Sequence, residues 1–168
     1  MHLHDLLAAA LAPTLALILP AAADPLDIGA ALPAVTATGQ DGNPVELAKD
    51  GASGWTLVYF YPKADTPGCT KQACSLRDAY QDLAAKGVRV FGVSMDEVAG
   101  QKAFADKFKL PFTLLADPEG KVVDAFGVPH RLKFASRQAF LFKDGKLAWR
   151  DLTASTAEQA ADVLAQIR

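Results

Sequence analysis

The chain has 168 residues, a formal net charge of −2 and a hydrophobic fraction of 51%. This length and apolar content are sufficient for one compact domain with a sizeable core. The 17 basic and 19 acidic residues are spread along the sequence, so no run of positive charge offers the surface that nucleic acid binding requires. The expected partners are therefore small molecules or other proteins.

The first 23 residues differ in composition from the rest of the chain. An apolar run, "LLAAALAPTLALIL", leads into "PAAADP", where Ala21 and Ala23 occupy the small-residue positions that precede a signal-peptidase site. We predict a signal peptide over residues 1–23, and hence an exported, periplasmic protein without membrane attachment after cleavage. The leading "MHLHD" lacks Lys and Arg, so a retained membrane anchor and a cytoplasmic location remain alternatives. Residues 24–168 are expected to form one domain.

The first half of this domain alternates between strand and helix patterns. Trp55–Tyr61, "WTLVYFY", predicts a central strand covered on both faces, because it is β-branched and aromatic almost throughout. Apolar positions at steps of three and four predict an amphipathic helix over Cys69–Lys86, which Gly87 ends. The next predicted elements are a strand over 88–94, a helix over 97–108, a short strand over 112–117 and a helical turn over 120–128.

The second half closes with a hairpin and a helix. Residues 137–150 predict the hairpin, since Asp144-Gly145 tolerates the positive φ values of a tight turn. Ser155 and Glu158 have the spacing of a capping box at the start of the last helix. Together these elements predict an α/β fold in which a central mixed sheet is flanked by helices.

The two cysteines of the chain lie together in "PKADTPGCTKQAC". Cys69 precedes Ala73 by four residues and shares the inward face of the predicted helix, whereas Cys74 lies about 140° around it, on the polar flank. Their Cα atoms would be about 8.7 Å apart on an ideal helix, while a disulfide requires about 4.4 to 6.8 Å. A bond between them therefore requires the first turns to unwind, which favours a reactive disulfide.

A permanent structural disulfide is the alternative for an exported protein. Closing so short a loop would contribute only about 2 kcal/mol, offset by the lost helical turn.

The residues around Cys69 are those that an activated thiol needs. At a helix start, unpaired backbone N–H groups and the positive end of the helix dipole favour thiolate over thiol. The hydroxyl of Thr66 is close enough in sequence to hold an oxygen-bearing substrate, although Thr66 also suits an N-cap. Pro62 can shield the sulfur from water without offering a competing N–H, or it simply ends the preceding strand.

The motif P-x-x-x-T-x-x-C, preceded by "VYFY", resembles the peroxiredoxin family. The C-x-x-x-x-C spacing resembles the peroxiredoxin Q subgroup, also called bacterioferritin comigratory protein. The similarity extends from about Leu26 to the C-terminus and includes "FTLLAD" and "FGV". It implies a thioredoxin-like fold, a monomer, and no metal, haem or flavin cofactor.

The resemblance also implies an arginine in contact with the reactive sulfur. The segment "RQAFLF" nominates Arg137, which would otherwise be a surface residue at the start of a strand. Arg131 is the competing candidate. Arg77 is expected to be solvated, and His130 is expected to lie in a loop.

The reaction implied by the resemblance is thiol-dependent reduction of hydrogen peroxide and organic hydroperoxides. Cys69 would become a sulfenic acid, Cys74 would convert it to an intramolecular disulfide, and a thioredoxin or a periplasmic thiol-disulfide reductant would restore both thiols.

Two other functions remain as alternatives. A thiol-disulfide carrier would normally have C-x-x-C, which is absent here. A copper-binding module would use Cys69, Cys74 and His130 as soft ligands, but two thiolates about 140° apart on a helix do not face one ion.

Overall fold

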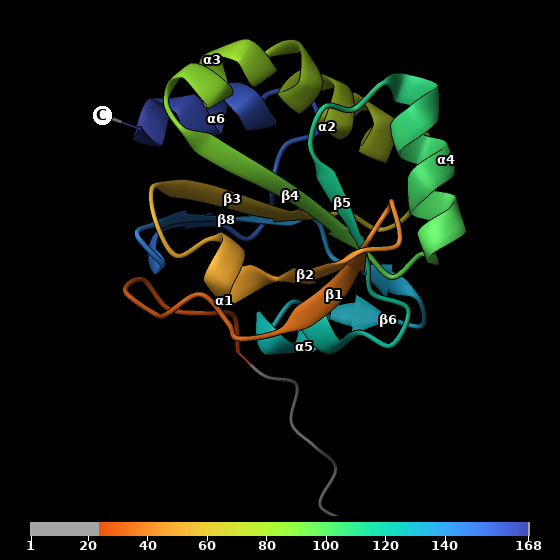
Figure 1. The fold of residues 1–168 in the computed structure, drawn as a ribbon, viewed down its shortest axis with the longest axis horizontal. Coiled ribbons are helices and arrows are strands. Elements are labelled where there is room, and N and C mark those ends of the chain that lie inside the picture. The colour runs from red at the N-terminus through yellow and green to blue at the C-terminus, as the bar shows by residue number, and fades with distance from the viewer. Residues whose placement is uncertain (1–23, 168) are drawn as a thin grey trace, which may run out of the picture.

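The strand predicted over Trp55–Tyr61 forms β3 (Trp55–Phe60), at the centre of a seven-stranded mixed sheet (Figure 1). The computed structural model describes residues 24–167, so the predicted signal peptide lies outside the described residues. Strand order in the sheet is β2-β1-β5-β4-β3-β8-β9. The other strands of the sheet are β1 (Thr36–Gly39), β2 (Pro44–Glu46), β4 (Val88–Ser94), β5 (Thr113–Ala116), β8 (Gln138–Lys143) and β9 (Lys146–Asp151).

Helices cover both faces of this sheet, as the α/β prediction required (Figure 1). The helices are α1 (Leu47–Asp50), α2 (Pro67–Asp78), α3 (Tyr80–Ala85), α4 (Val98–Phe108), α5 (Lys121–Ala125) and α6 (Gln159–Gln166). Side chains alternate along β3: Leu57 and Tyr59 enter the core under α2, α3, α4 and α6, while Val58 and Phe60 enter the core on the side of α1 and α5. Burial on both faces explains why this strand has no polar alternation. Among residues 24–167, no helix combines the length and apolar character needed to cross a bilayer.

The helix predicted over Cys69–Lys86 is divided in two at Ala79. This residue has φ −94° and ψ 9°, and it separates α2 from α3. Backbone hydrogen bonds nevertheless continue across it, from Ala79 N to Ser75 O at 3.2 Å and from Leu83 N to Ala79 O at 3.1 Å. The bend lets Tyr80 pack against Phe112, with ring centroids 6.0 Å apart. The apolar period was therefore right, and only the uninterrupted helix was wrong.

Three shorter segments also differ from the prediction. The last helix begins at Gln159, because Ser155 Oγ accepts hydrogen bonds from the N–H groups of Ala157 and Glu158 in a turn that precedes it. The one-turn helix α1 was not predicted. His130 lies in a small hairpin formed by β6 (His130–Arg131) and β7 (Phe134–Ala135), and not in a loop.

The sheet topology gathers three chain segments at one edge. Strands β3 and β4 are parallel and end side by side, with Phe60 opposite Val93. Strand β8 is antiparallel to β3 and begins there, with Gln138 opposite Phe60. The loop that leads into α2, the loop after β4 and the residue before β8 consequently meet at this edge.

The close contact between β4 and the Tyr59 ring allows a direct test of the packing. A Cβ on Gly92 would lie 2.7 Å from the Tyr59 hydroxyl oxygen and 2.8 Å from Leu114 Cδ2. We expect Gly92→Ala to lower the free energy of unfolding by about 1–3 kcal/mol through overpacking, measured by urea denaturation. Gly100→Ala is the control, because a Cβ there meets only Asp96 Cβ at 3.6 Å, and it should be neutral or stabilising. Equal stability of the Gly92 variant and the wild type would contradict this packing.

Candidate active site

The loop between β3 and α2 is held by the carboxylate of Asp96, which follows β4. Asp96 Oδ2 accepts hydrogen bonds from the Ala64 N–H at 2.8 Å and from the Ser94 hydroxyl at 2.7 Å. Its Oδ1 forms an ion pair with Lys63 Nζ at 2.8 Å. One side chain therefore fixes two consecutive loop residues against the end of the sheet.

A buried amide extends this network to α4. Gln101 Nε2 donates to Ser94 Oγ at 2.9 Å and to the Leu115 carbonyl at 2.7 Å, and Gln101 Oε1 accepts from the Tyr61 hydroxyl. Burial raises the pKa of Tyr61 far above its ordinary value, so this hydroxyl remains a donor. The position of the loop is thus determined by β4, β5 and α4 together.

The charge of Asp96 is stabilised by the partners that it holds. Burial acts to raise the pKa of this carboxyl, but the hydrogen bonds from Ala64, Lys63 and Ser94, with the charge of Lys63, outweigh burial and lower the pKa below its ordinary value. Asp96 is therefore a stable anion at neutral pH.

Thr66 occupies the N-cap position of α2 but does not cap it with its side chain. Its hydroxyl donates to the Lys63 carbonyl at 2.9 Å, and its backbone carbonyl accepts from Thr70 N at 2.8 Å. Pro62 is half-buried at the beginning of the same loop. The hydrogen of the Thr66 hydroxyl is thus engaged inside the loop, while its oxygen lone pairs remain available.

Cys69 is the third residue of α2 and is 2% exposed. Arg137 Nη2 donates to its sulfur at 3.4 Å. The two residues meet because Arg137 immediately precedes β8 at the edge where β3 ends. The competing candidate, Arg131, lies on the exposed β6–β7 hairpin.

Gly68 leaves room for this arginine. A Cβ at this position would lie 3.2 Å from Arg137 Nη2, which is tighter than ordinary van der Waals contact. The glycine before Cys69 therefore lets the guanidinium approach the helix start.

Sequence reasoning missed two buried glutamines beside this pair. Gln72 Oε1 accepts from Arg137 Nη1, and Gln72 Nε2 donates to Gln159 Oε1 on α6. Gln72 lies three residues after Cys69 and four before Leu76, so it shares the inward face of the helix with them. A polar residue at such a position is a signal that could have found it, whereas nothing in the sequence linked it to Gln159.

Cys74 lies on the same helix as Cys69, and both are unpaired thiols. Cys74 is partly exposed, whereas Cys69 is buried.

Arg77, in the next turn of α2, differs from expectation. It is not simply solvated, because its Nη1 donates to the Phe108 carbonyl at the end of α4 at 3.0 Å. Its Nη2 forms an ion pair with Asp78 at 2.7 Å. The C-terminal half of α2 is consequently attached to α4.

The copper arrangement considered above does not form. His130 Nε2 lies 3.1 Å from Asp124 Oδ1. Among residues 24–167, no three His, Cys, Asp or Glu side chains gather as a metal-binding group.

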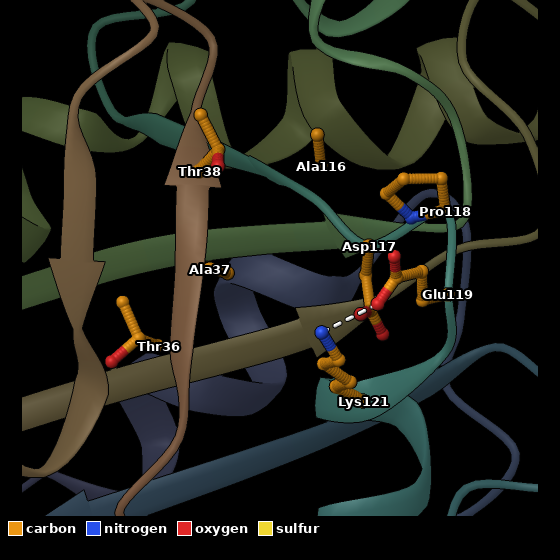
Figure 2. Close-up of a pocket in the computed structure, with 8 residues that line it drawn as sticks. All are labelled: Thr36, Ala37, Thr38, Ala116, Asp117, Pro118, Glu119 and Lys121. Atoms are coloured by element: carbon orange, nitrogen blue, oxygen red, sulfur yellow. Dashed lines mark ion pairs between the residues drawn. The ribbon is translucent and has the colours of Figure 1, made fainter.

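A shallow pocket of about 200 Å³ lies elsewhere, between β1 and the segment after β5 (Figure 2). Lys121 and Glu119 form an ion pair at its rim. Burial raises the pKa of the Asp117 carboxyl, whose Oδ2 accepts from the N–H groups of Val122 and Val123 at 3.0 and 2.9 Å. Because Asp117 serves the start of α5 and no predicted site residue lines this pocket, it is not the candidate site.

The fold and the site together define a class of protein. A mixed sheet with helices on both faces, and a buried thiol beside an arginine at a helix start, is a thioredoxin-like fold that carries a cysteine site. Residues 28–150 match the AhpC/TSA family, and the chain belongs to this family.

Within that family, the chain is similar to peroxiredoxin Q proteins. Peroxiredoxin Q from Sedum lineare, a chloroplastic protein, is 48% identical over 104 residues, which are 62% of this chain and 55% of that protein. The chain therefore spans only about half the length of this curated relative.

Two solved structures agree with this assignment. Peroxidoxin BcpB from Mycobacterium tuberculosis has a TM-score of 0.78 and 31% identity, covering 84% of this chain and 96% of that one. The bacterioferritin comigratory protein of Xanthomonas campestris has a TM-score of 0.76 and 25% identity, covering 84% and 97%.

The comparison contradicts the predicted location. The Sedum relative is a chloroplastic protein, and on this finding the prediction of an exported, periplasmic protein is wrong. An apolar run before a small-residue site was insufficient evidence without the positive charge that normally precedes it.

The anchoring of the loop by Asp96 predicts a pH-dependent loss of stability. A carboxyl whose folded-state pKa is lowered stabilises the fold above the ordinary Asp pKa of about 3.9, and this stabilisation is lost as pH falls through the folded value. Asp96→Ala should therefore lower the free energy of unfolding by about 1–2 kcal/mol at pH 7, and the difference from wild type should narrow in acid.

Guanidinium chloride denaturation at neutral and acid pH measures this difference. Asp106→Ala is the control, because its ion pair with Lys102 is exposed and worth about 0.3–0.5 kcal/mol. A difference for Asp96→Ala that stays constant with pH would show that the charge is not what holds the loop.

Proposed function

We propose that the protein is a thiol-dependent peroxidase that reduces hydrogen peroxide and organic hydroperoxides with Cys69 as its nucleophile. The observation that carries the proposal is the 3.4 Å contact between Arg137 Nη2 and a sulfur at the start of a 12-residue helix. Membership of the AhpC/TSA family supports it. So does the likeness to the Xanthomonas protein, whose structures were studied for alkyl peroxide reduction.

In the first step, the Cys69 thiolate attacks the terminal oxygen of the hydroperoxide. The guanidinium of Arg137 donates to this sulfur, and the N–H groups of the first turn of α2 give the helix start a positive potential. An S–O bond forms and the O–O bond breaks, and the electron pair of that bond leaves on the other oxygen. This oxygen takes a proton and departs as water or an alcohol, leaving Cys69 as sulfenic acid.

Charge develops on the departing oxygen, so a donor is needed beside it. Arg137 and the backbone amides near Cys69 supply such donors without rearrangement.

Thr66 and Pro62 orient the substrate in this proposal. Because the Thr66 hydroxyl already donates to the Lys63 carbonyl, Thr66 Oγ1 would accept the O–H of the hydroperoxide. Pro62 offers no N–H that would compete for the peroxide oxygens. The anchored loop would thus hold the O–O bond in line with the sulfur.

In the second step, the Cys74 thiol attacks the sulfenic sulfur. An S–S bond forms between Cys69 and Cys74, and water leaves. Since both residues lie in the regular helix α2, its first turns must unwind, which would break the contact of Gln72 with Gln159. A thioredoxin-like dithiol would then return two electrons and two protons to restore both thiols.

From the likeness to the peroxiredoxin Q group we infer that the protein acts as a monomer.

The first test follows peroxide consumption and intact mass for wild type, Cys69→Ser and Cys74→Ser, with a thioredoxin system as reductant. We expect Cys69→Ser to be inactive, because it removes the nucleophile. Cys74→Ser should turn over once and then gain one and later more oxygen atoms on Cys69. Equal activity in both variants would refute these roles, and fast reduction of insulin without peroxide consumption would favour a thiol-disulfide carrier instead.

The second test concerns the structure of the oxidised form. We expect the disulfide to lower helical circular dichroism and to speed amide hydrogen exchange between Cys69 and Asp78, because the bond cannot form on an intact helix. Helix α4, which carries no cysteine, is the internal control. Identical spectra and exchange in the two redox forms would contradict unwinding.

A further inference from the structure

A row of buried amides connects the C-terminal helix to the reactive sulfur. Arg137 lies between Cys69 and Gln72, and Gln72 lies between Arg137 and Gln159. Gln72 and Gln159 are fully buried. Helices α2 and α6, which carry the two glutamines, pack against each other on the same face of the sheet (Figure 1).

The direction of every hydrogen bond in this row is set by the guanidinium. Arg137 can only donate, so Gln72 must turn its carbonyl oxygen toward it. The amide nitrogen of Gln72 then faces Gln159, which must present its own carbonyl oxygen. The amide nitrogen of Gln159 is left, and within the described part of the chain it is buried without a partner.

This unpaired nitrogen shows that the bond to Gln72 sets the orientation of the Gln159 amide. A buried donor without a partner costs free energy, and reversing the Gln159 amide would change its surroundings. Reversal would, however, place two amide nitrogens against each other and break the bond to Gln72. The orientation is therefore the one that keeps the row continuous up to Arg137.

We propose that Gln159 is a positioning residue for the Cys69 thiol, acting through Gln72 and Arg137. The two terminal nitrogens of Arg137 belong to one rigid plane, with Nη1 bonded to Gln72 and Nη2 to the sulfur. Because Gln159 holds Gln72 on the side away from Arg137, the guanidinium is held with Nη2 directed at Cys69. The C-terminal helix thereby sets the reactivity of a thiol on α2, and the inference rests on the proposed role of Cys69 as nucleophile.

The test measures alkylation of Cys69 by iodoacetamide as a function of pH, in a Cys74→Ser background so that one thiol reacts. Gln159→Met keeps the size of the side chain and removes its acceptor. We expect the half-maximal rate to move to higher pH by about half a unit to one unit, as loss of one hydrogen bond implies. Gln166→Met, at the exposed end of the same helix, should leave the profile unchanged.

A double-mutant comparison tests whether Gln159 acts on Cys69 through Gln72 and Arg137, a row of contacts that we call the relay. Gln72→Met should shift the profile at least as far as Gln159→Met, and the double variant should shift it no further than Gln72→Met alone. Shifts that add would overturn the proposal. So would a Gln159→Met variant that melts at a lower temperature but keeps the wild-type pH profile, since that is the behaviour of a purely structural residue.

Two further outcomes are a Gln159 variant that does not fold and a protein that consumes no peroxide. If Gln159→Met does not fold, Gln159→Asn keeps a neutral amide but withdraws its carbonyl oxygen from Gln72. It should move the profile in the same direction as Gln159→Met, and a wild-type profile would contradict the relay. The alkylation assay contains no peroxide. A protein that consumes no peroxide but shows the expected shifts would therefore refute the peroxidase proposal and leave the relay intact.

Discussion

The candidate site depends on one contact, in which the Arg137 guanidinium donates to the Cys69 sulfur. Neither residue is positioned by its own neighbours in sequence. The parallel strands β3 and β4, whose ends meet at one edge of the sheet, position Cys69. The antiparallel strand β8, which starts beside them, positions Arg137. The mixed character of the sheet is thus what allows a cation from the second half of the chain to reach a helix start in the first half.

Much of this arrangement could be predicted from local patterns. The uninterrupted apolar run of β3 indicated a strand buried on both faces, and the period of the Cys69 helix placed Cys69 inward and Cys74 on the flank. Arg137 was nominated only through a family resemblance, because no local pattern ties it to a residue 68 positions away. The structure brings Cys69 and Arg137 together and places Cys74 on the same helix as Cys69.

The buried polar groups could not be predicted in the same way. Gln72, Gln101 and Gln159 each bond to a group that is distant in sequence, so these partners follow from tertiary packing alone. The break at Ala79 is similar, because no helix-breaking residue marks it and the residue after it, Tyr80, packs against the distant Phe112. The prediction of the location was wrong for a different reason: an apolar N-terminal run resembles several kinds of targeting segment.

The two polar networks at the site hold different elements, and this separation matters for the proposed cycle. Asp96 and Gln101 fix the loop of Lys63 and Ala64 against β4 and α4. Gln72 and Gln159 fix the first turns of α2 against α6. Unwinding of those turns breaks the second network but none of the hydrogen bonds of the first. In the proposed cycle, Lys63 and Ala64 can therefore keep their positions while the first turns of α2 open and close.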